Sequence, residues 1–161
     1  MKLTGTGAQT RVRFDPTEAT ILGVQLDELL VSLDEMGPGD PVWERLYPAA
    51  FDDAEAAEEF REMVGEDLDN ARRERVGACR AELAAAAEAP TRRGRDIILG
   101  REELERWIMA LNDLRLALGT SLEIAAGDDG AIDPLDPQAQ ARAIYQWLTA
   151  VQDGLVAAAL S

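Results

Sequence analysis

The sequence contains no histidine and one cysteine, Cys79, among its 161 residues. Without histidine, the chain can form no Ser-His or Cys-His nucleophile pair and no histidine-containing zinc or iron site. One cysteine allows neither an intrachain disulfide nor a cysteine metal cage. We therefore expect no enzymatic activity, no metal site and no cofactor.

The sequence also lacks apolar runs long enough to cross a bilayer. The first seven residues, which carry a lysine, two threonines and two glycines, have no apolar stretch typical of a signal peptide. We therefore expect a soluble, cytoplasmic protein without a membrane partner.

Basic residues are few. Sixteen lysines and arginines stand against 31 acidic residues, which gives a formal net charge of −15. Such a charge repels phosphate backbones, because affinity for nucleic acids depends on cations that displace counterions. The composition predicts a protein that does not bind nucleic acid.

Hydrophobic periodicity predicts a mainly α protein that forms one helical domain over residues 1–161. A four-helix core is expected from helices at about 16–36, 52–88, 101–124 and 137–160. Alternating residues at about 10–14 predict a short strand, and the apolar segment at about 96–99 predicts a second one; the two would pair into a small two-stranded β ribbon beside these helices. The expected buried face of the second helix consists of Phe60, Met63, Val64 and Ala71.

The first helix begins with a capping-box-like pair, Asp15 and Glu18, and carries two apolar stripes. The second stripe consists of Ile21, Val24 and Val31. A helix that is apolar on two sides is either central to a bundle or shared with another subunit. Trp147 likewise lies off the main apolar stripe of its own helix, so these four residues form the expected interface of a homodimer.

Two charged residues lie on apolar helix faces and are the most informative polar positions. Arg115 falls between Leu111 and Leu118, and Asp67 falls beside Phe60 on the preceding long helix. A buried charge requires a partner, so we expect Arg115 and Asp67 to form an ion pair. The alternative is a ligand site in which Arg115 acts together with Asn112 and Asp113.

Arginines are concentrated near the end of the long helix and in the turn after it. They are Arg72, Arg73, Arg75 and Arg80, followed by Arg92, Arg93 and Arg95. Arginines on helices are expected to pair with local Glu and Asp residues of the same segment. The alternative interpretation is a patch that binds anions.

Three segments resemble an actinobacterial domain-of-unknown-function family, number two-thousand-seventeen. They are Trp107 to Thr120, which includes Asn112, Asp113 and Arg115; Arg45 to Pro48 with Asp52 and Asp53; and Tyr145 to Val156. The resemblance covers nearly the whole chain and implies no assigned activity. Relatives are often labelled transcriptional regulators. Their genes tend to lie near that of the ClpS protease adaptor, which implies a link to protein turnover.

These observations favour a non-enzymatic regulatory protein that interacts with a protein partner through a helical surface. The alternative function is a small-ligand or anion-binding module centred on Arg115, Asn112 and Asp113.

Overall fold

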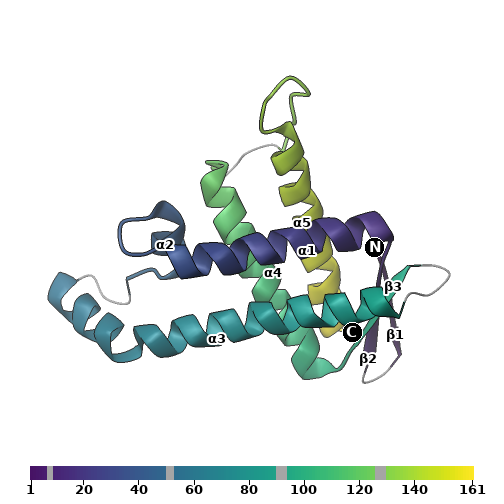
Figure 1. Ribbon diagram of the computed structural model, residues 1–161, viewed down its shortest axis with the longest axis horizontal. Coiled ribbons are helices and arrows are strands. Elements are labelled where there is room, and N and C mark those ends of the chain that lie inside the picture. The colour runs from purple at the N-terminus through teal and green to yellow at the C-terminus, as the bar shows by residue number, and fades with distance from the viewer. Residues whose placement is uncertain (7–8, 50–52, 90–93, 126–129) are drawn as a thin grey trace.

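The computed structural model describes residues 1–6, 9–49, 53–89, 94–125 and 130–161. They form a mainly helical protein with a small antiparallel sheet at one end (Figure 1). The helices are α1 (Pro16–Glu35), α2 (Pro41–Leu46), α3 (Ala54–Glu88), α4 (Arg101–Ser121) and α5 (Ala139–Ala159). The strands are β1 (Lys2–Thr6), β2 (Gln9–Phe14) and β3 (Arg95–Leu99). The mainly α prediction is confirmed, and α2 is a short additional helix.

The sheet has three strands in the order β1-β2-β3. The predicted pairing of β2 with β3 is confirmed, with Val12 opposite Ile97. The prediction of only two strands was wrong, because β1 adds to the other edge of β2 and places Leu3 opposite Val12. Val12 and Phe14 turn into the core, whereas Arg11 and Arg13 project from the opposite face.

The turn into β3 requires a glycine. Gly94 has a φ of +137°, and a Cβ atom at this position would lie 2.4 Å from the carbonyl oxygen of Phe14. Both the backbone angle and the close approach of β2 exclude larger residues here. Gly94 therefore allows the chain to return from α3 into the sheet.

Local sequence explains the start of α1. Asp15 accepts a hydrogen bond from the backbone of Glu18, the Glu18 side chain accepts one from the Asp15 backbone, and Pro16 occupies the first turn. The main apolar stripe of α1, which includes Leu22, Leu26 and Leu29, is buried. The second stripe is not covered: Val24 is 47% exposed and Val31 is 55% exposed.

The central helix is α4. It contacts α1, α2, α3, α5 and β3, and it buries Trp107, Ala110, Leu111 and Leu114. The interpretation of α1 as the central helix was therefore wrong. The second apolar stripe of α1, on which that interpretation was based, lies at the surface.

The long helix α3 packs against the rest of the molecule through its C-terminal half, where Val76, Cys79 and Leu83 are buried. Its N-terminal half extends beyond the other helices (Figure 1). The prediction that Met63 and Ala71 are buried was wrong, because no neighbouring helix covers this part; Met63 is 73% exposed. The side chains of Phe60 and Val64 lie outside the described residues.

Candidate functional site: a network of ion pairs and two open clefts

Asp113 of α4 is 4% exposed and lies between two arginines of α3. Its Oδ2 is 3.0 Å from Nη1 of Arg75 and 3.1 Å from Nε of Arg72. A carboxylate buried to this degree is stable only when it is paired. The two arginines satisfy its charge and fix α4 against α3.

Arg72 also reaches α2. Its Nη2 donates to the carbonyl oxygen of Leu46 at 3.0 Å, and its guanidinium lies 4.4 Å from the centre of the Tyr47 ring. The Tyr47 hydroxyl donates to Asp69 at 2.6 Å. Burial raises the pKa of Tyr47, and the hydrogen bond to the Asp69 carboxylate raises it further.

Ion pairs hold α3 against both of its neighbouring helices at a spacing of seven residues. On one side, Arg73 and Arg80 pair with Asp34 and Asp27 of α1 at 2.9 Å and 2.8 Å. On the other side, Arg75 and Glu82 pair with Asp113 and Arg106 of α4. Residues seven apart share one helix face two turns apart, so each series joins a pair of antiparallel helices. Carboxylates pair with Arg72, Arg73, Arg75 and Arg80, but the expectation of local partners holds only for Arg73, which pairs with Asp69; the other pairs join α3 to α1 and α4.

The anion-patch alternative is not supported at these four arginines, because carboxylates already pair with all of them. Arg92 and Arg93 lie outside the described residues.

Arg115 turns away from α3 and binds α5. Its Nε donates to the Thr149 hydroxyl at 3.0 Å and its Nη1 donates to the side-chain carbonyl of Gln152. Gln152 in turn donates to the carbonyl oxygen of Ile108 at 3.2 Å. Arg115 thus joins α4 to α5 through neutral hydrogen-bond acceptors.

The predicted ion pair between Arg115 and Asp67 was wrong. Asp67 is exposed on the part of α3 that extends beyond the other helices, whereas the Arg115 side of α4 faces α5. The sequence had placed both residues correctly on helices, but periodicity alone does not specify which neighbouring helix a face contacts.

The structure does not bring Asn112, Asp113 and Arg115 together. Asn112 is exposed, Asp113 is held by α3, and Arg115 is held by α5. Asp113 and Arg115 lie about 160° apart around the helix and must face different neighbours, whereas Asn112 lies only about 60° from Arg115 but is exposed. Sequence reasoning missed Arg72 and Arg75 as the partners of Asp113. A signal was present in the seven-residue spacing of Arg106 and Asp113, which puts both on the face of α4 that contacts α3.

Two clefts open along the surface of α1. One, of about 500 Å³, lies between α1, α2 and α4; we call it the α1–α2 cleft. The other, of about 540 Å³, lies between α1, α4 and α5; we call it the α1–α5 cleft. Gln25, Glu28 and Leu118 line both, so the two clefts are neighbours.

Two of the four predicted interface residues line the α1–α5 cleft. They are Ile21 and Val24, next to Leu118 and Ile144. Val31 is exposed on the same helix outside both clefts. Trp147 packs against the core and is only partly exposed, so its side chain contributes mainly to the fold.

The described residues contain no group of three acidic or cysteine side chains that could hold a metal ion. Cys79 is buried, and its burial raises the pKa of the thiol to about 12. None of the helices in the described ranges has the length and apolar character needed to span a membrane.

The fold and the site define a helical scaffold whose buried charges are paired and whose open apolar surface lies along α1. Residues 2–159 match the family described as Domain of unknown function (DUF2017), and the chain belongs to this family. No solved structure matches it.

Two relatives are each named Oxidative stress regulator AosR, from Mycobacterium tuberculosis and Mycobacterium bovis. The chain is 32% identical to each over 126 residues, which cover 74% of this chain and 58% of the relative. It therefore spans less than two thirds of the length of these relatives. Regulation is the role that their name gives, and the description of the family assigns no activity.

Proposed function

We propose that this chain is a non-enzymatic regulatory protein that acts by binding another protein through the surface formed by α1, α4 and α5. The main support is the pair of neighbouring clefts along α1, where Val24 is nearly half exposed and Ile21 and Leu118 are only partly covered. Apolar surface gathered in a concave region is typical of sites that bind proteins. The regulatory role follows the name of the relatives.

The alternative of a small-ligand module centred on Arg115, Asn112 and Asp113 has less support. The charges of Asp113 and Arg115 are used to join α4 to α3 and α5. A ligand at Asp113 would have to displace Arg72 and Arg75 from a carboxylate that is 4% exposed. Such a displacement leaves charges unpaired in a dry region, at a high cost in free energy.

Co-purification from the native host, followed by mass spectrometry, tests the proposal. The intact chain is compared with Val24→Asp in the cleft and with Leu68→Asp on the extended part of α3. The two residues are 47% and 51% exposed, so the changes are matched in chemistry and in exposure. We expect a protein that the intact chain and Leu68→Asp retain and Val24→Asp loses. Retention of no protein, or of the same proteins by all three, would contradict the proposal.

Self-association through Ile21, Val24 and Val31 stays a prediction. Light scattering over a wide range of concentration tests it, since a homodimer has twice the mass of the 17.5 kDa chain. The link to protein turnover also stays a prediction; it gains support if the partner lost from Val24→Asp belongs to a protease or its adaptor.

A further inference from the structure

The two sides of α1 differ in how their carboxylates are paired. Asp27 and Asp34 point towards α3 and pair with Arg80 and Arg73. The next residue after each aspartate is a glutamate, Glu28 or Glu35, which lines the clefts on the other side. These glutamates are also seven residues apart, which is roughly 10 Å along the helix axis.

The described residues on the cleft side of α1 make this face acidic. Among the described residues, the linings of both clefts contain three carboxylates, from Glu28, Glu35 and Asp40, and no lysine or arginine. None of the three takes part in an ion pair of the described residues. Ile21, Val24 and Leu118 supply apolar surface next to these charges.

The chain itself contains an example of a helix that fits such a face. Helix α3 lies antiparallel to α1, presents arginines at positions 73 and 80 to the aspartates, and packs Val76 and Leu83 into the core between the helices. Figure 1 shows α1 and α3 side by side along most of the length of α1. The cleft side of α1, about 100° around the helix from the aspartates, repeats the spacing of the carboxylates without such a helix packed on it.

We propose that the clefts along α1 bind an amphipathic helix of a partner protein, with two basic residues seven positions apart that pair with Glu28 and Glu35. Its apolar residues contact Ile21, Val24 and Leu118, in the manner of a helix that lies in a groove. The face from Ile21 to Glu35 is roughly 21 Å long at the rise of an α-helix, which four turns of a partner helix cover. This inference rests on the proposed function and names the chemistry of the partner.

A second copy of this chain is a poorer occupant. A two-fold symmetric contact would bring together two copies of a surface that carries Glu28, Glu35 and Asp40 and, among its described lining residues, no lysine or arginine. Like charges placed opposite each other disfavour such an interface, and the net charge of −15 adds to the repulsion. A partner with basic residues complements the face.

Binding of a synthetic helical peptide to the intact chain tests the inference. The probe has about 16 residues, with arginines at positions i and i+7 and leucines between them on the same face. The control peptide has the same composition, with the second arginine moved to i+5 so that the two arginines lie on different faces. Fluorescence anisotropy measures binding at physiological salt, and amide chemical shifts show where the peptide contacts the protein. We expect the probe to bind about tenfold more tightly than the control peptide.

Matched protein variants distinguish binding in the clefts from attraction of the peptide to the overall negative charge of the chain. Glu28→Lys with Glu35→Lys reverses the two cleft carboxylates. Glu59→Lys with Glu66→Lys makes the same change at the same spacing on exposed positions of α3. We expect the first pair to weaken binding of the probe about tenfold and the second to change it little.

Three results would overturn the inference: equal weakening by both pairs of changes, equal binding of the two peptides, or shifts that map away from α1, α4 and α5. A dimer that buries Glu28 and Glu35 would also overturn it and would favour self-association at this face. Failure of the peptide leaves the proposed function standing if a natural partner is lost from Val24→Asp. The proposed function fails by itself if the co-purified proteins do not depend on Val24.

Discussion

Asp113 and Arg115 stand two residues apart on α4 and join it to different helices. The Asp113 carboxylate lies 3.0 Å from Arg75 of α3, and the Arg115 guanidinium lies 3.0 Å from the Thr149 hydroxyl of α5. The segment that carries the family resemblance thus contains the residues that hold three helices together. Through these contacts, this segment of α4 fixes the helices that surround the α1 surface.

Removal of the Asp113 carboxylate should cost more stability than removal of the Arg115 guanidinium. Asp113→Ala leaves Arg72 and Arg75 without their shared carboxylate in a nearly dry region, and we expect a loss of about 3–5 kcal/mol. Arg115→Ala removes hydrogen bonds to neutral groups, and we expect a loss of about 1–2 kcal/mol. Urea unfolding of the three proteins measures both values. An equal or larger loss for Arg115→Ala would show that the assignment of partners is wrong.

The burial of Tyr47 and its hydrogen bond to Asp69 should make the stability of the folded protein fall at alkaline pH. Burial and the Asp69 carboxylate raise the pKa of Tyr47 in the folded protein above its unfolded value of about 10. The folded state therefore holds the proton more tightly. The resulting stability is fully present below pH about 10 and is lost as the pH rises through the folded pKa.

Tyr47→Phe tests this dependence. The variant should lose about 1 kcal/mol at neutral pH, because Asp69 loses one hydrogen bond. It should also lose the part of the alkaline decline that comes from Tyr47. Unfolding curves of both proteins between neutral and strongly alkaline pH measure the difference, and parallel declines would argue against the raised pKa.

How much of this arrangement the sequence could predict depends on the range of the interaction. The start of α1 was predictable because Asp15 and Glu18 are three residues apart and their reciprocal hydrogen bonds are local. The pairing of β2 with β3 was predictable because two short strand-like segments each stand directly before a helix, and a short strand is stable only when it pairs with another. Strand β1 was missed because Gly5 and two threonines in a short N-terminal segment are equally typical of a loop.

The partners in the polar network could not be predicted from the sequence, for a different reason. The position of Arg115 on an apolar face correctly indicated that it needs a partner. The predicted partner was the carboxylate of Asp67, whereas the neutral oxygens of Thr149 and Gln152 accept the hydrogen bonds of Arg115. Which helix faces α4 on each side depends on how the helices are rotated in the bundle, and no periodic pattern of one helix contains this information.

Cys79 should be inert towards thiol reagents in the folded protein. It is completely buried, and the raised pKa of its thiol, about 12, leaves almost no thiolate at neutral pH. Relatives of the chain are named oxidative stress regulators, but thiolate chemistry at Cys79 requires unfolding of α3. Labelling with Ellman's reagent should be slow in buffer and fast in guanidinium chloride. Rapid stoichiometric labelling of the native protein would contradict the burial of this thiol.

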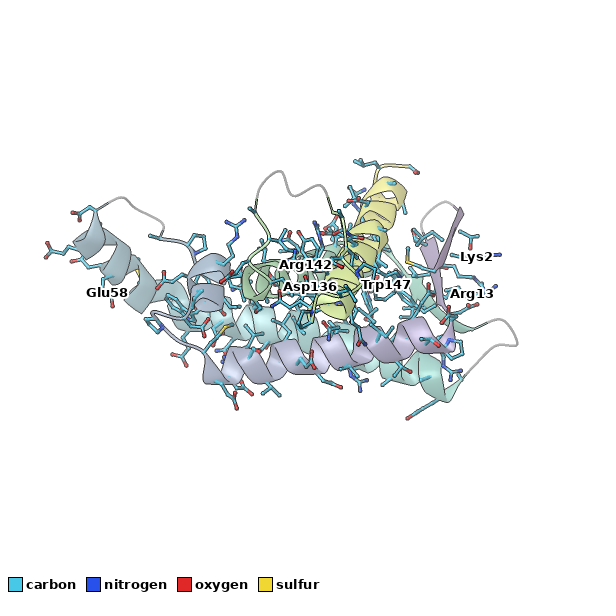
Figure 2. The ribbon with its side chains drawn as sticks, turned by 90° about the horizontal axis from the view of Figure 1, so that it is seen from above. Lys2, Arg13, Glu58, Asp136, Arg142 and Trp147 are labelled. Carbon is cyan, nitrogen blue, oxygen red and sulfur yellow. The ribbon has the colours of Figure 1, made fainter. Side chains whose placement is uncertain are left out.

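Basic side chains that could contact DNA lie on the outer face of the sheet. We nevertheless expect the chain to show no detectable binding to duplex DNA at physiological salt. Lys2, Arg11 and Arg13 lie on this face, and Figure 2 shows Lys2 and Arg13 at the end of the molecule opposite Glu58. Asp96 pairs with both Arg11 and Arg13.

Hydrogen bonding from Arg13 lowers the pKa of Asp96, so this carboxylate stays ionised and continues to neutralise the patch under ordinary conditions. The remaining positive charge of this face is opposed by the net charge of the whole chain, which is −15. Anisotropy of a labelled duplex should therefore show no binding at protein concentrations up to roughly micromolar. Asp96→Asn releases Arg11 and Arg13 and provides the sensitive comparison, because any affinity of the sheet for phosphates should increase in this variant. Tight binding by the unaltered chain that weakens steeply with salt would contradict the prediction, since it would require phosphate contacts that outweigh the net charge.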